Sequence, residues 1–161
     1  MTLHELCGTL LETLKAGGHT LAVAESCTGG MIASAIVAHA GCSDSFLGGA
    51  VVYTNRLKHD ILGVPDEIFS GPGAVSAECV EAMLTGTLAV MHSDCAIAVS
   101  GIAGPGGAVP GKPVGTVYIG AAFGEKRKVV RLNISGSRDD VRTKSACEAV
   151  ELLIDAVRGI L

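Results

Sequence analysis

Two stretches of this sequence supply residues that could carry out acyl transfer, and the first is AESCTGG at 24–30. It follows a predicted strand and begins a predicted helix, so the hydroxyl of Ser26 is placed as a nucleophile at the carboxyl edge of a sheet. The backbone amides from Cys27 to Gly29 come next and are placed to stabilise an oxyanion. Two alternatives stay open: Cys27 is the nucleophile, or Ser26 and Thr28 only cap the helix.

The second stretch, VVYTNRLKHD at 51–60, supplies a base for that serine in Lys58, with Tyr53 at the end of a predicted strand. Lysine acts as a base only if burial or nearby positive charge lowers its pKa from about 10.4 toward about 7.4, a change worth about 4 kcal/mol. Arg56 or a cationic substrate is a candidate source of that charge. The alternative is that Lys58 is an ordinary solvated lysine.

A third stretch, GPGGAVPGKPVG at 104–115, differs by one residue from a Walker A phosphate-binding loop. The spacing from Gly106 to Gly111 and Lys112 is correct, but Pro113 occupies the position that requires Ser or Thr. The stretch also leads into a predicted strand and not a helix, so we do not expect a nucleoside triphosphatase. Its glycines still allow backbone amides to approach an anion, and the alternative is a turn that binds nothing.

Hydrophobic periodicity predicts the elements that position these stretches. Apolar residues at helical spacing predict helices at 3–14, after 30, through 57–62, after Ser76 and after Ser137. Apolar runs predict strands at 20–25, 46–53, 95–100, 114–123 and 128–134, and the last two flank a turn as an antiparallel pair. The sequence therefore predicts an α/β fold in which helices cover both faces of one mixed sheet.

Composition limits the class of protein. The 161 residues are expected to form one domain, 1–161, because 48% are hydrophobic and only 17% are charged. A net charge of −4 and an aromatic content of 3% argue against nucleic acid as a partner. No segment is apolar enough to span a membrane and no signal peptide is evident, so we expect a cytoplasmic protein with no membrane partner. The six cysteines and five histidines form no metal-binding pattern, so neither metal nor disulfide is expected.

Six motifs occur in order along the chain: AESCTGG, FLGGAVVYTNRLK, LGVP, GAVSAECVEAM, AVSGIAGPGG and GKPVGTVYIG. With these motifs the chain resembles the CinA C-terminal domain family over nearly its whole length. The family's fold is a three-layer α/β/α sandwich with a mixed five-stranded sheet, and the family includes nicotinamide-nucleotide amidases. Because the chain begins at its own first helix, it resembles the stand-alone amidases. The resemblance implies hydrolysis of nicotinamide mononucleotide to nicotinate mononucleotide and ammonia, without metal or cofactor, by a homodimer or a higher homo-oligomer.

The resemblance also implies roles for individual residues. Ser26 is the nucleophile, Lys58 is its base and Tyr53 is an assisting hydroxyl. The substrate, a small nucleotide, is expected to lie against the residues Cys27, Thr28, Gly29, Gly30, Asn55, Ser100, Gly101, Gly104 and Gly106. Ser100 departs from the Thr of many relatives, which keeps the hydroxyl but loses a methyl group that could pack against the substrate.

Two arginines in SRDDVR, Arg138 and Arg142, are one helical turn apart and on the same face. We expect them to lie near the substrate phosphate or to stabilise the subunit contact. The alternative is that they form ion pairs with Asp139 or other nearby acids.

Two other functions stay open. A binding or regulatory domain would keep the same pocket without turnover. A Ser/Lys peptidase would need an extended groove or a strand edge for its substrate, and the sequence alone does not show one.

Overall fold

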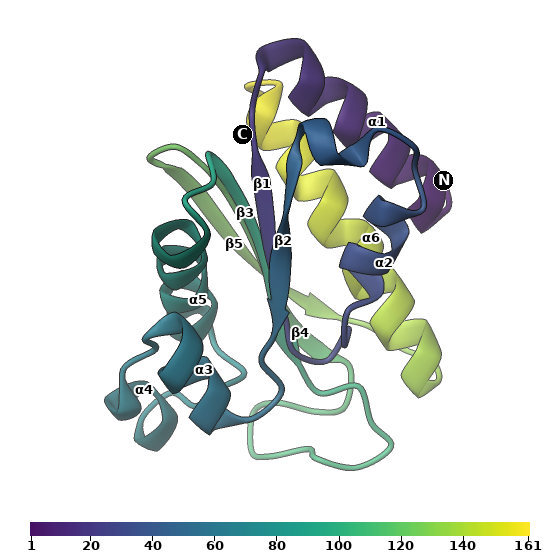
Figure 1. Ribbon diagram of the computed structural model, residues 1–161. Coiled ribbons are helices and arrows are strands. Elements are labelled where there is room, and N and C mark those ends of the chain that lie inside the picture. The colour runs from purple at the N-terminus through teal and green to yellow at the C-terminus, as the bar shows by residue number, and fades with distance from the viewer.

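The computed structural model describes residues 1–161 and is built around one sheet of five strands (Figure 1). In chain order these strands are β1 (Leu21–Glu25), β2 (Phe46–Val51), β3 (Cys95–Gly101), β4 (Thr116–Phe123) and β5 (Lys126–Asn133). Their spatial order is β2-β1-β3-β4-β5. β1 is parallel to both β2 and β3, whereas β4 is antiparallel to both β3 and β5. The predicted α/β class, the mixed sheet and the antiparallel β4–β5 pair are confirmed.

Helices cover both faces of the sheet. One face carries α1 (Leu3–Gly17), α2 (Met31–Val37) and α6 (Arg138–Val157), and the other carries α3 (Asn55–Leu62), α4 (Asp66–Ser70) and α5 (Ala77–Met91) (Figure 1). A separate hydrophobic cluster fills the space between the sheet and each helical layer. The three-layer sandwich is therefore confirmed. No helix has the length and apolar character that crossing a membrane requires.

The helix ends follow from local sequence. Gly18 adopts φ 67° and ends α1, which a residue with a side chain would do only with strain. Ser76 accepts a hydrogen bond from the amide of Cys79 at the start of α5. Ser137 and Asp140 form a capping box at the start of α6. These ends are where the sequence predicted them.

The structure differs from the predicted elements at a few boundaries. β2 ends at Val51, two residues early, because Thr54 is already the N-cap of α3. β5 begins at Lys126, since its pairing with Phe123 continues to the turn. α4 and a 3₁₀ helix at Cys42–Asp44 were not predicted, because elements of five and three residues are too short to show periodicity.

Candidate active site

Ser26 and Lys58 meet at the carboxyl end of the parallel strands. The last residue of β1, Glu25, pairs with Val51 on β2 and with Val99 on β3. The amide of Ser26 still donates to the Val99 carbonyl at 3.1 Å, so the sheet fixes the position of the serine. The Nζ atom of Lys58, on α3, lies 3.0 Å from Ser26 Oγ. Ser26 is 6% exposed and Lys58 only 2%.

The amine of Lys58 has three oxygen atoms around it. Besides Ser26 Oγ, the carbonyls of Val52 and Tyr53 lie 2.9 and 3.2 Å from Nζ. A neutral amine can donate its two protons to the two carbonyls, which leaves its lone pair facing the serine hydroxyl. Burial lowers the pKa of Lys58 from its ordinary value of 10.5, against opposing effects from the thiols of Cys79 and Cys27. The site can therefore hold an amine that accepts the proton of Ser26.

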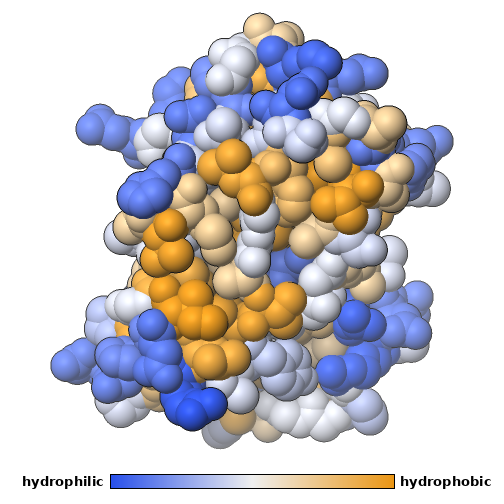
Figure 2. All heavy atoms as spheres, in the orientation of Figure 1, coloured by the Kyte–Doolittle hydropathy of each residue, from blue (hydrophilic) through white to orange (hydrophobic).

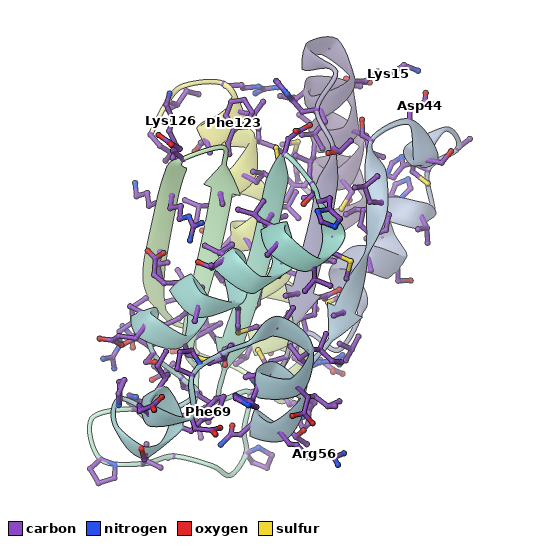
Figure 3. All side chains as sticks on the ribbon, turned by 60° about the vertical axis from the view of Figure 1, so that its left-hand side comes forward. Lys15, Asp44, Arg56, Phe69, Phe123 and Lys126 are labelled. Carbon is purple, nitrogen blue, oxygen red and sulfur yellow. The ribbon has the colours of Figure 1, made fainter.

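Arg56 does not supply the positive charge that we expected beside Lys58. Its side chain is exposed and extends away from the protein (Figure 3). The physical reason is helical geometry, because residues two positions apart point in different directions from the helix axis. Burial alone is the cause that lowers the pKa of Lys58.

The turn that carries Ser26 is held by Glu25, a residue that sequence reasoning missed. Its carboxylate is 1% exposed and accepts hydrogen bonds from the amides of Ile32 and Ala33 at 2.9 and 3.0 Å. These amides belong to the first turn of α2, whose N-cap residue, Gly30, has no capping side chain. An acid at the end of an otherwise apolar strand was the signal. The alternative that Ser26 and Thr28 cap α2 is therefore wrong.

The same contact changes which groups can bind an oxyanion. Because Glu25 occupies the N-terminus of α2, the donors available beside Ser26 lie earlier in the turn. The amide of Gly29 donates to the Ser26 carbonyl, whereas the amides of Cys27 and Thr28 donate to no other residue. The Thr28 hydroxyl is buried without a hydrogen-bond partner. Two of the three expected amides are thus free.

Arg142 binds the backbone of this turn. Its Nε donates to the Cys27 carbonyl at 3.0 Å and its Nη2 to the Thr28 carbonyl at 3.2 Å. The remaining nitrogen, Nη1, lies 3.3 Å from Asp139 Oδ1, so the ion pair foreseen as the alternative is present. Arg142 therefore connects α6 to the turn of Ser26 through Nε and Nη2, while its Nη1 pairs with Asp139 on α6 itself.

Arg138 connects two other parts of the site. Its Nη1 donates to the Gly104 carbonyl at 2.7 Å, and its Nη2 lies 3.3 Å from the Tyr53 hydroxyl. Tyr53 is 58% exposed, so its hydroxyl lies at the surface while its carbonyl contacts Lys58. Asn55 is exposed at the first position of α3.

Ser100 and Gly101 lie where β3 ends, beside the turn of Ser26. The Ser100 hydroxyl donates to the Ala74 carbonyl at 2.8 Å, which connects β3 to the segment before α5. Gly101 is required by packing, because a Cβ atom there would lie 2.6 Å from Val117 Cγ2. Neither residue needs a ligand to explain its type.

The glycine-rich loop that follows leads into β4, as the sequence predicted, and it is not a Walker A loop. Lys112 donates to the Pro72 carbonyl and pairs with Val109 in an isolated β-bridge. Gly104 is buried near the site through its contact with Arg138, whereas Gly106 is exposed with open space around it. Of these two glycines, only Gly104 therefore contacts another residue of the predicted site.

Two further observations concern the chemistry. Burial raises the pKa of the Cys27 thiol to about 11, so the thiol stays protonated near neutral pH, which argues against Cys27 as the nucleophile. No group of three or more His, Cys, Asp or Glu side chains is placed to hold a metal ion.

Known proteins resemble this chain in sequence and in structure. The sequence model of the CinA C-terminal domain matches residues 3–157. "CinA-like" proteins of Thermotoga neapolitana and Myxococcus xanthus are 49% and 45% identical over 89% of the chain, but over only 35% and 34% of their own lengths. The chain thus spans about a third of these curated relatives.

Two solved structures match over nearly their full lengths. A competence-damaged protein (CinA) superfamily protein of Klebsiella pneumoniae has a TM-score of 0.95 and 34% identity over 99% of both chains. A competence/damage inducible protein of Agrobacterium tumefaciens has a TM-score of 0.93 and 35% identity, over 97% of this chain and 95% of that one.

Proposed function

The chain belongs to the CinA C-terminal domain family, and from that premise we propose that it hydrolyses the carboxamide of nicotinamide mononucleotide to nicotinate mononucleotide and ammonia. The observation that carries this proposal is the 3.0 Å contact between Ser26 Oγ and a buried Lys58 Nζ. A serine hydroxyl beside a lysine of lowered pKa is an activated nucleophile and suits acyl transfer.

The first half of the reaction forms an ester on Ser26. Neutral Lys58 takes the hydroxyl proton as Oγ attacks the carboxamide carbon, and the negative charge on the carbonyl oxygen is stabilised by the free amides of Cys27 and Thr28. The protonated Lys58 then gives its proton to the leaving nitrogen, and ammonia departs as the carbon–nitrogen bond breaks.

The second half releases the acid. Water loses a proton to Lys58 and attacks the ester carbon, and the same proton returns to Ser26 Oγ as the carbon–oxygen bond to the serine breaks. Nicotinate mononucleotide leaves, and both side chains regain their starting protonation states. One buried amine therefore serves both halves of the cycle.

The substrate's own charge fits this site. The cationic pyridinium ring withdraws electrons from the carboxamide, which makes its carbonyl carbon unusually electrophilic for an amide. A cationic ring near Nζ also disfavours protonated Lys58, so binding would lower the pKa of Lys58 further. A neutral benzamide gains neither effect.

The substrate phosphate needs donors outside the nucleophile turn, and we assign this role to Arg138. Its side chain is exposed and lies between Gly104 and the Tyr53 hydroxyl. Arg142 is a poorer candidate, because all three of its nitrogens already contact the protein.

A second candidate activity is peptide hydrolysis by the same Ser26–Lys58 pair. The observation that favours it is the free edge of β2, which ends beside the site and could pair with an extended peptide. A substrate competition distinguishes the two activities, because a mononucleotide would inhibit peptide cleavage only if both use one site.

The decisive experiment measures ammonia and nicotinate mononucleotide after incubating the protein with nicotinamide mononucleotide. We expect equimolar products from the wild type and none from Ser26→Ala. Calorimetry with the same nucleotide separates the alternatives: binding without ammonia release would identify a regulatory domain and overturn the proposed activity.

A further inference from the structure

The helix that carries Lys58 is held in place mainly by one other helix. Among the helices and strands, α3 packs chiefly against α5, and α5 in turn packs on β1, β3 and β4 of the sheet. Hydrophobic side chains also gather on the surface of the molecule over α3 (Figure 2). The position of Lys58 therefore depends on how closely α3 approaches α5.

The two helices come closest at Gly86 of α5. A Cβ atom on Gly86 would lie 1.9 Å from the carbonyl oxygen of Leu62, the last residue of α3. That oxygen belongs to the backbone and cannot rotate away, and a close carbon–oxygen contact is normally about 3.3 Å or longer. Any side chain at position 86 would therefore push the helices apart by more than about 1 Å. Glycine is unfavourable inside a helix, so this contact explains its presence within α5.

The helix α5 has no room to move toward the sheet. Gly120 on β4 faces it, and a Cβ atom there would lie 2.6 Å from Val80 Cγ1 and 2.9 Å from Leu84 Cδ1. Because the sheet and α5 are already in close contact, a side chain added at Gly86 would displace α3, the outer helix, and not α5.

The contact at Gly86 lies on the faces of the two helices that enclose the base. Lys58 and Leu62 are one turn apart on the same face of α3, and both are buried. Cys79 and Gly86 are two turns apart on the same face of α5, and Cys79 is buried too. The titratable groups that affect the pKa of Lys58 are the thiols of Cys79 and of Cys27, in the turn of Ser26.

The burial of Lys58 requires that no gap exists between these faces. Lysine usually buries only its carbon stem and keeps its amine in water. Here the whole side chain is buried, and burial is what lowers the pKa of the amine. A stem with four carbons could turn its amine toward water through a narrow gap, away from the Ser26 hydroxyl.

We propose that the face of α5 at Cys79 and Gly86 positions the base of this site: Gly86 lets α3 contact the backbone of α5, which seals the Lys58 side chain from water and holds its Nζ atom at the Ser26 hydroxyl. Gly86 is a positioning residue, because it acts only through Lys58. The sealing stands on packing alone, whereas its effect on turnover rests on the proposed function.

The direct test measures the pKa of Lys58 by NMR in protein that contains isotope-labelled lysine, with Lys58→Met to identify the signal. In the wild type we expect Lys58 to titrate below its ordinary value of 10.5. In Gly86→Ala water reaches the amine, so the pKa should rise back toward that value. Gly8→Ala is the matched control in α1, where the added Cβ atom meets only the movable His39 ring, 3.1 Å away, and it should leave Lys58 unchanged.

The pH dependence of turnover gives a second readout. If Gly86 only stabilised the fold, Gly86→Ala would lower kcat/KM by the same factor at every pH. We expect instead a loss of about 10- to 100-fold near pH 7, with KM little changed. This loss should shrink as the pH rises, because more of the amine is then neutral and can accept the serine proton. Gly8→Ala should keep the wild-type profile.

Each outcome has a definite meaning once circular dichroism has shown which variants fold. A folded Gly86→Ala with an unchanged Lys58 pKa would overturn the proposal, as would a wild-type Lys58 that titrates like an exposed lysine. If Gly86→Ala does not fold, Cys79→Ser replaces it, because it keeps the backbone contact but puts a hydroxyl on the same face. The pKa of Lys58 should again rise, and an unchanged value would overturn the sealing by α5.

The two readouts also separate this inference from the proposed function. A Lys58 pKa that rises in Gly86→Ala, in a protein that releases no ammonia from nicotinamide mononucleotide, would overturn the proposed function and leave the sealing intact. Ammonia release by the wild type with identical Lys58 titrations in all variants would do the reverse.

Discussion

Two glycine-rich segments, each associated with a lysine, follow neighbouring parallel strands, and the structure treats them differently. The turn after β1 is buried around Ser26, and its lysine, Lys58, is 2% exposed with Nζ on the serine hydroxyl. The loop after β3 is exposed from 105 to 111, and its lysine, Lys112, donates to the carbonyl of Pro72, which is 40 positions away in the sequence. The loop that resembles a Walker A phosphate-binding loop is the more exposed of the two segments.

If the proposed function holds, burial and the contacts from Arg142 and Glu25, more than glycine content, distinguish the segment that carries the nucleophile. The backbone of the first turn is bound by Arg142, and Glu25 fixes the helix that follows it. Such contacts hold reacting groups within the small tolerance that acyl transfer requires. Changes in the first segment should therefore reduce turnover strongly, and changes in the second should not.

The largest effect is expected from Ser26→Ala. Removing the nucleophile should lower kcat by about 10³-fold or more, with little change in thermal stability, because the hydroxyl adds only one hydrogen bond. Initial rates of ammonia release measure the loss. Cys27→Ala is the neighbouring control and should keep most of the activity, since its thiol is protonated. The reverse pattern would make Cys27 the nucleophile.

Lys58→Arg should be nearly as damaging, because arginine keeps the charge but cannot release a proton near neutral pH. In the wild type, kcat/KM should rise with pH through the lowered pKa of Lys58, since only the neutral amine accepts the serine proton. The activity thus falls as the pH is lowered and Lys58 becomes protonated. A rate profile recorded from pH 5 to 10 measures this; an active, pH-independent Lys58→Arg would direct the search for a base to Tyr53.

Glu25→Gln should have an intermediate effect. Both carboxylate oxygens accept amide protons, so a glutamine must turn its own donor toward Ile32 or Ala33. We expect kcat to fall about 10- to 100-fold with a smaller change in KM. The change displaces the turn that carries Ser26, whereas the residues proposed to bind the substrate keep their side chains. The free energy of unfolding should fall by about 1–3 kcal/mol.

The exposed Glu12 on α1 offers the matched control for this change. Glu12→Gln should leave both kinetic constants and the melting temperature at wild-type values. If Glu25→Gln lowered stability while kcat remained unchanged, Glu25 would hold the fold without positioning the nucleophile.

Much of this arrangement was predictable from the sequence because the signals were local. Apolar periodicity and turn residues predicted the five strands and the long helices, and AESCTGG marked the turn of Ser26. The roles of Glu25, Arg138 and Arg142 were harder to predict from the sequence, because their hydrogen-bond partners are brought close only by the tertiary fold. Arg142 contacts carbonyls 114 and 115 positions away, and no local pattern indicates that contact.

The smallest effect is expected from Lys112→Ala, and this prediction tests the comparison most directly. In a Walker A loop the equivalent change would remove a phosphate ligand and abolish activity. Here the ammonium donates to the Pro72 carbonyl, its loop leads into a strand, and Pro113 offers neither a hydroxyl nor an amide. We expect kcat/KM within about twofold of wild type and a loss of about 0.5–1.5 kcal/mol in the free energy of unfolding, the contribution of one hydrogen bond. Rates and denaturant midpoints measured on the same preparation give both values. A loss of kcat/KM comparable to that of Lys58→Arg would show that both glycine-rich segments contact the substrate, and the distinction between them would no longer hold.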